Sequence, residues 1–99
     1  MYEVLINYIV KEDCCDDHIL AIRKLFDGLR KIQIEGVRIT VFRLEHVFLH
    51  IVQYKSKETE AELYASHSYQ EFIDALEWRL QEPPIINHIT EIETYNYCT

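Results

Sequence analysis

Four stretches of this chain are rich in hydrophobic residues and resemble extended strands, and in two others the hydrophobic residues recur at helical spacing. The four strand-like stretches are residues 2–11, 37–44, 47–54 and 85–97. Only Glu45 and His46 separate the second stretch from the third, which predicts a hairpin. On the first strand, the face predicted to be buried carries Tyr2, Val4, Ile6, Tyr8 and Val10.

A first helix is predicted after Asp13 or Asp16, because either carboxylate can accept hydrogen bonds from the first free amides of a helix. We expect it to end near Gly36. One stripe of this helix is apolar, and it consists of Ile19, Ile22, Leu25, Phe26, Leu29 and Ile32.

A second helix is predicted after a polar linker at residues 55–60, and it ends before Pro83-Pro84 because proline cannot donate an amide hydrogen bond. Two capping boxes, Thr59 with Glu62 and Ser68 with Glu71, predict that this helix is broken. Its apolar stripe consists of Tyr69, Phe72, Ile73, Leu76 and Leu80.

The predicted order of elements is βαββαβ, which is that of the ferredoxin-like α+β fold. Right-handed crossovers then place both helices on one face of a four-stranded antiparallel sheet, with the first and third strands in its centre. We expect residues 1–99 to form one domain of this kind.

The third strand, residues 47–54, has no polar face, so both of its faces are expected to be covered. We predict that Val47, Leu49 and Ile51 pack against the helices. The residues predicted for the opposite, bare face are Phe48, His50, Val52 and Tyr54, together with Leu5, Asn7, Ile9, Arg38, Thr40 and Phe42. Such an apolar face predicts a homodimer in which two sheets close on each other around a lined cavity.

The net charge of the chain limits the kinds of molecule that it is expected to bind. With 17 acidic and 10 basic residues the net charge is -7, which disfavours nucleic acid and anionic membrane surfaces. No leader-like segment or apolar span is present, so a cytoplasmic location is expected. The three cysteines make a poor disulfide framework, which agrees with a reducing compartment.

The cluster Cys14-Cys15-Asp16-Asp17-His18 combines sulfur, carboxylate and imidazole. It lacks the paired spacing of a zinc site, so we interpret it as a surface loop that leads into a helix. A redox role for the two adjacent cysteines remains open. His46 and His50 lie about 13 Å apart along a strand and cannot share one ion. No metal or organic cofactor is therefore expected.

The element order over nearly the whole chain resembles the dimeric α/β-barrel superfamily, and within it the antibiotic-biosynthesis monooxygenase-like domains. The resemblance is sharpest at Asn7 on the first strand and from Tyr54-Lys55-Ser56-Lys57 through Tyr69-Gln70-Glu71-Phe72. It implies a homodimer with a pocket between each sheet and its own helices, and in some members cofactor-independent oxidation of aromatic polyketides. A related branch degrades haem with a tryptophan and a histidine, but Leu63 and Ile73 stand at those positions here. Trp78 and His88 do not replace them, so haem degradation is not expected.

Within this resemblance the predicted catalytic residues are Asn7, which can bind an oxyanion, and His50, which can accept a phenolic proton. Each also has a purely structural interpretation, as a satisfied polar group of the core or interface. The residues predicted to line an aromatic site are Phe42, Phe48, Tyr64, Phe72 and Trp78. Arg79, beside Trp78, is a candidate for gripping a carboxylate. Two functions remain open: a small oxygenase-like enzyme acting on an aromatic substrate, and a non-catalytic dimeric domain that binds an apolar ligand or serves as an accessory subunit.

Overall fold

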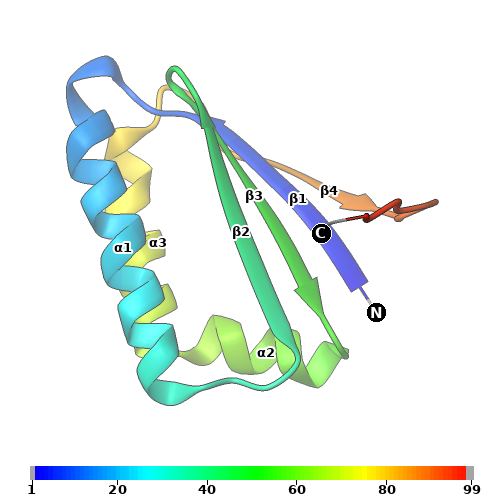
Figure 1. The fold of residues 1–99 in the computed structure, drawn as a ribbon. Coiled ribbons are helices and arrows are strands. Elements are labelled where there is room, and N and C mark those ends of the chain that lie inside the picture. The colour runs from blue at the N-terminus through cyan, green and yellow to red at the C-terminus, as the bar shows by residue number, and fades with distance from the viewer. Residues whose placement is uncertain (1, 98–99) are drawn as a thin grey trace.

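The computed structural model describes residues 2–97, and it contains one sheet with its helices gathered on one side (Figure 1). The elements in chain order are β1 (Tyr2–Ile9), α1 (Cys15–Ile32), β2 (Val37–Leu44), β3 (Val47–Tyr54), α2 (Lys57–Ala65), α3 (His67–Leu76) and β4 (Ile85–Ile89). Short 3₁₀ turns at Glu12–Cys14 and Glu77–Arg79 precede α1 and follow α3.

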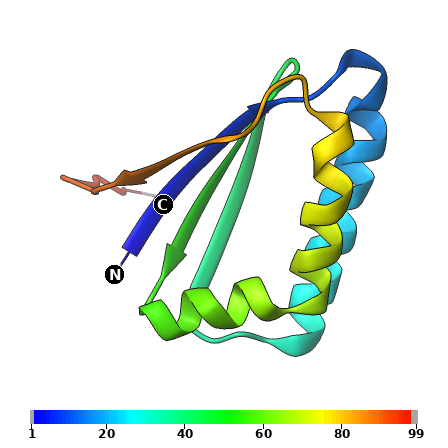
Figure 2. The same cartoon turned by 180° about the vertical axis from the view of Figure 1, so that it is seen from behind.

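The sheet has the strand order β2-β3-β1-β4, and all neighbouring pairs are antiparallel. β1 and β3 are therefore central, as the sequence predicted. Seen from behind, α3 lies beside α1, and α2 crosses the end of the sheet (Figure 2). This arrangement confirms the ferredoxin-like α+β architecture, with an open sheet face opposite the helices.

Three residues with positive φ make the sharp turns between elements. Gln33 (φ 53°) ends α1 in the left-handed conformation, three residues before Gly36, and its amide donates to the carbonyl of Leu29. Gly36 (φ 80°) then starts the approach to β2. Glu45 (φ 53°) closes the hairpin, so a glutamate does what a glycine usually does in such turns.

The break in the second helix is confirmed, but the predicted caps are wrong. The side chain of Ser56 accepts from the amide of Thr59 to cap α2, and that of Ser66 accepts from the amide of Tyr69 to cap α3. Four of the six residues of the predicted linker are consequently helical, because α2 already begins at Lys57.

The side chains of β3 face in the opposite directions from those predicted. Phe48, His50, Val52 and Tyr54 are buried under the helices, whereas Val47, Leu49 and Ile51 lie on the open face and are partly exposed. The hairpin register is the physical reason. It pairs Phe42 with Leu49, and directly opposed residues in a sheet share a face.

Two strands, β1 and β4, are shorter than predicted. β1 ends at Ile9, and Val10 makes only an isolated bridge to Leu80. β4 ends at Ile89, and residues 90–97 have no regular secondary structure and extend away from the helices (Figure 2).

Two clusters of buried side chains lie between the sheet and the helices. The larger one centres on Tyr8, Leu25, Phe48 and Phe72, and the smaller one on Val4, Val52, Tyr54 and Leu63. None of the helices within residues 2–97 has the length and apolar character needed to cross a membrane.

Candidate functional site

A buried polar cluster lies inside the larger core, where β1, β3 and α1 meet. The hydroxyl of Tyr8 lies 2.7 Å from Nε2 of His18 and 2.5 Å from Nε2 of His50. β1 and β3 position Tyr8 and His50 on the helix side of the sheet, and the first turns of α1 bring His18 over them. All three side chains are at most 5% exposed. We call these three residues the Tyr-His cluster.

Aromatic rings enclose the Tyr-His cluster. The ring of Phe48 stacks on Tyr8 at 5.9 Å between centroids and meets His18 edge-on at 4.8 Å. Phe72 covers the other side, 5.5 Å from His18 and 5.9 Å from His50. The cluster therefore lies in a dry environment, in which hydrogen bonds are strong and charges are unfavourable.

Burial sets the protonation state of this cluster. It lowers the pKa of His50 to about 4. Burial, Arg79 and the neighbouring His50 lower the pKa of His18 to about 4. Burial also raises the pKa of the Tyr8 phenol, with a smaller contribution from Tyr69. At neutral pH all three groups are uncharged, so each imidazole has one protonated and one unprotonated ring nitrogen.

The two hydrogen bonds of the Tyr8 hydroxyl require His18 and His50 to be protonated on different ring nitrogens. A phenol has one proton to donate, so Tyr8 donates to Nε2 of one imidazole and accepts from a protonated Nε2 of the other. The two neutral rings are therefore different tautomers. Nδ1 of His18 is buried and has no hydrogen-bond partner within residues 2–97. The hydrogen-bonded chain from His50 through Tyr8 to His18 therefore stops at this atom.

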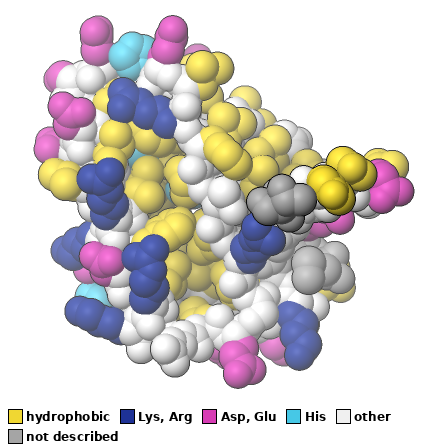
Figure 3. Space-filling model, viewed as in Figure 1, with side chains coloured by type: hydrophobic (Ala, Val, Ile, Leu, Met, Phe, Trp, Pro, Cys, Tyr) yellow, Lys and Arg dark blue, Asp and Glu magenta, His cyan; other side chains and the backbone are white. Residues whose placement is uncertain are grey.

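An apolar hollow of about 210 Å³ opens between α1, β2 and α2 (Figure 3). Hydrophobic side chains line it, chiefly Phe26, Leu29, Val37, Ile39 and Leu63. Along β2, Ile39 is two residues from Val41, the direct neighbour of His50. The hollow thus ends about 7 Å from the strand position opposite His50.

The two predicted catalytic residues lie on opposite faces of the sheet. Asn7 pairs with Leu49 on the open face, whereas His50 pairs with Ile6 under the helices. The expectation that both side chains share one face is wrong, for the register reason given above. Asn7 and His50 of one chain therefore cannot contact the same small substrate.

The predicted aromatic lining is also divided. Phe48 and Phe72 enclose the Tyr-His cluster, but Phe42 is 53% exposed on the open sheet face. Tyr64 on α2 is 39% exposed, and Trp78 is 57% exposed in the turn after α3. Only two of the five aromatic residues thus surround the cluster.

The segment Cys14–His18 is not the surface loop that we expected. Cys14 and Cys15 are free thiols and are buried, and His18 is fully buried. Sγ of Cys15 lies 3.5 Å from Nδ1 of His46. Residues 2–97 contain no group of three or more His, Cys, Asp or Glu side chains placed to hold a metal ion.

Sequence reasoning missed Tyr8 and His18 as site residues. The signal was present for His18, which precedes Ile22 by four residues and Leu25 by seven and so lies on the apolar stripe of α1. Tyr8 was correctly predicted to face the core, but a tyrosine there does not reveal its partners.

Comparison with solved structures identifies the fold class. The chain is similar to a protein from Nitrosomonas europaea named a putative antibiotic biosynthesis monooxygenase, with a TM-score of 0.82, 18% identity, and coverage of 94% of this chain and 100% of that one. A protein from Caulobacter crescentus CB15 with the same description gives a TM-score of 0.81 and 14% identity over 93% of this chain and 90% of that one. A conserved protein from Methanosarcina mazei Go1 has a TM-score of 0.79 and 15% sequence identity, with 89% of each chain covered.

No family model matches the sequence, and no curated protein matches it. At these identities the structural likeness shows the fold alone. The chain therefore has the fold of the antibiotic-biosynthesis monooxygenase-like proteins, as its sequence predicted.

Proposed function

We propose that this protein is a homodimeric, monooxygenase-like domain that binds a small aromatic molecule between the sheet and its own helices. The observation that supports the proposal is the Tyr-His cluster: a phenol held between two neutral imidazoles inside an aromatic enclosure. A core that served only packing would gain little from three buried polar groups. Each of them must be hydrogen-bonded, because a buried polar group without a partner lowers the stability of the fold by about 1–3 kcal/mol.

The chemistry that fits this cluster is removal of a phenolic proton. A substrate in the hollow beside Ile39 would approach along β2 toward His50, and Tyr8 would pass the accepted proton on to His18. The resulting phenolate transfers an electron to dioxygen more readily than the phenol does. Asn7 has no part in this step, since it lies on the other face of the sheet.

The homodimer is supported by the open sheet face. Phe42 and Leu44 on β2 are 53% and 67% exposed, and Ile85 on β4 is 56% exposed. Tyr95, in the extended segment after β4, is 88% exposed. Apolar surface of this kind is typical of protein interfaces.

Light scattering tests the dimer with two matched variants. Leu44→Glu places a charge on the open face and is expected to give a monomer, whereas Leu20→Glu, at a leucine of α1 that is 62% exposed, is expected to leave the dimer intact. A monomeric wild-type protein at micromolar concentration would contradict the proposal.

Activity is tested with 1-naphthol and dioxygen. The balanced reaction gives 1,4-naphthoquinone and water: the substrate loses two hydrogens, one oxygen atom enters the product, and the other is reduced to water. We expect oxygen uptake and quinone absorbance with the wild type, and a loss of at least about tenfold in His50→Gln. The control is His88→Gln, an exposed histidine on β4.

A second candidate function is a non-catalytic, ligand-binding or accessory domain. It is favoured by the mutual satisfaction of Tyr8 with both histidines and by the phenylalanine rings that fill the space around them. Binding of 1-naphthol without oxygen uptake would support this alternative. Absence of binding would refute both functions.

A further inference from the structure

A second concave site lies on the outer side of the helix layer. A groove of about 800 Å³ runs between α1 and α3. Its lining includes the apolar side chains of Ala21, Leu25, Phe72 and Ala75. The two helices approach closely at Gly28, where an added Cβ would lie 1.9 Å from Oγ of Ser68. Phe72 separates this groove from the Tyr-His cluster, because the same ring contacts His18 and His50 on its inner side.

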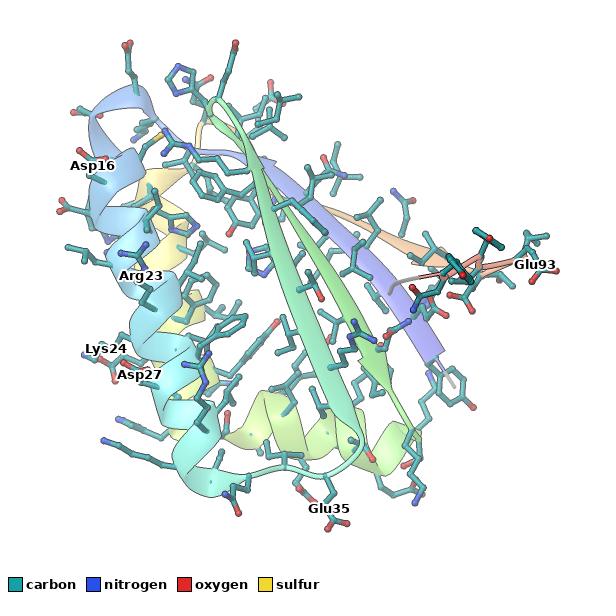
Figure 4. The ribbon with its side chains drawn as sticks, viewed as in Figure 1. Asp16, Arg23, Lys24, Asp27, Glu35 and Glu93 are labelled. Atoms are coloured by element: carbon teal, nitrogen blue, oxygen red, sulfur yellow. The ribbon has the colours of Figure 1, made fainter. Side chains whose placement is uncertain are left out.

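Acidic and basic side chains are equally numerous among the residues that line the groove, and several of them are paired. Lys24 of α1 forms an ion pair with Glu71 of α3 across the groove. Asp27 pairs with Arg30, 3.1 Å away, one turn along α1. Lys24 and Asp27 point away from the sheet (Figure 4). The rim therefore offers little net attraction for a highly charged ligand.

Arg79 differs from the other charged residues of this groove because part of its guanidinium is buried without a partner. Its Nε and Nη1 atoms are buried and have no hydrogen-bond partner within residues 2–97. The guanidinium carbon lies 5.0 Å from the ring centroid of Trp78, which stacks on it but accepts no conventional hydrogen bond. Leaving two donors of a buried cation unpaired is unfavourable, so the site favours an acceptor that brings negative charge.

We propose that the α1–α3 groove binds a small molecule with one carboxylate and an apolar body. The carboxylate pairs with the guanidinium of Arg79, which lines the groove, and the apolar body lies along Leu25, Phe72 and Ala75. A single negative charge matches the partly buried guanidinium of Arg79, and a groove of this volume has room for a ligand of drug-like size. This site lies outside the aromatic-binding interior and does not depend on its chemistry.

Trp78 provides a direct readout, because it is the only tryptophan of the chain and its ring contacts the Arg79 guanidinium. The probe is octanoate, titrated into the full chain while Trp78 fluorescence is followed. Octan-1-ol has a similar apolar chain without the charge, and inorganic phosphate supplies an anion without the apolar chain. We expect a saturable change with octanoate, and at least about tenfold weaker binding of either comparison compound.

Two charge-removing variants complete the test. Arg79→Gln is expected to weaken octanoate binding by about tenfold or more, because it removes the charge-assisted hydrogen bonds. Arg23→Gln removes the same charge from an exposed position on α1 outside the groove (Figure 4) and is expected to bind as the wild type does. Since Arg79→Gln also changes the surroundings of Trp78, calorimetry measures the affinities of both variants, and circular dichroism confirms that they fold.

Equal octanoate affinity in Arg79→Gln and the wild type would overturn the proposal. So would equal affinity for octan-1-ol and octanoate, or no saturable binding at millimolar concentration. Failure of the 1-naphthol experiment would leave these results unaffected, since octanoate binding is measured without 1-naphthol.

Discussion

Acidification from pH 7 to pH 5 is expected to cost the folded protein about 4 kcal/mol through His18 and His50. The pKa of each imidazole is lowered from 6.5 to about 4 by burial. In the unfolded chain both rings take up a proton as the pH falls below about 6.5, but in the folded chain they stay neutral down to about 4. The unfolded state therefore binds more protons in this window, and the free energy of unfolding decreases as the pH falls. One pKa unit corresponds to about 1.4 kcal/mol, so each histidine contributes about 2 kcal/mol at pH 5.

Urea unfolding followed by circular dichroism, at fixed protein concentration and several pH values from 7 to 5, measures this loss. Substituting either buried histidine by glutamine is expected to remove about half of the pH dependence, even though it also lowers stability at pH 7. His88→Gln, at an exposed position on β4, serves as the control for the histidine-to-glutamine substitution itself. A wild-type stability that differs by less than about 1 kcal/mol between pH 7 and pH 5 would refute the reasoning.

Three further outcomes follow from buried contacts. Tyr8→Phe leaves the two imidazoles of the cluster without their shared hydroxyl, so urea unfolding should show a loss of about 2 kcal/mol or more. Gly28→Ala forces a methyl group against Ser68 and is expected to cost about 1–3 kcal/mol, whereas a stability equal to the wild type would show that the helices can separate freely. In a Cys98→Ser background, the buried thiols of Cys14 and Cys15 should react with a disulfide reagent at least about tenfold more slowly in the folded than in the unfolded protein, and equal rates would contradict their burial.

The course of the chain could be predicted because its hydrophobic periods are clear, but one strand was assigned to the wrong faces. β3 is apolar on both sides, so its own pattern does not tell which side is inside. The register of the β2–β3 hairpin decides which side of β3 faces the helices. Once Phe42 was placed on the open face, the two-residue turn required its partner Leu49 to share that face, and Phe48 and His50 to face the helices.

The candidate site could be predicted only in part. His50 is a histidine in an apolar strand and stands out from the sequence alone, and His18 extends the apolar stripe of α1. Their meeting at the Tyr8 hydroxyl depends on the crossover of α1 over the sheet, which no local pattern encodes. The unpaired donors of Arg79 were even less accessible to prediction, because an arginine near the end of a helix usually reaches solvent.

Because side chains alternate along β3, its two sets of residues are expected to evolve under different constraints. Substitutions at Phe48, His50 and Val52 alter the interior chemistry, whereas substitutions at Leu49 and Ile51 alter only what the open face can adhere to. A lineage that drifts at the odd-numbered positions can therefore change its assembly while its interior is preserved. Homologues that share the even-numbered residues of this strand would then be expected to share a ligand, even where their quaternary structures differ.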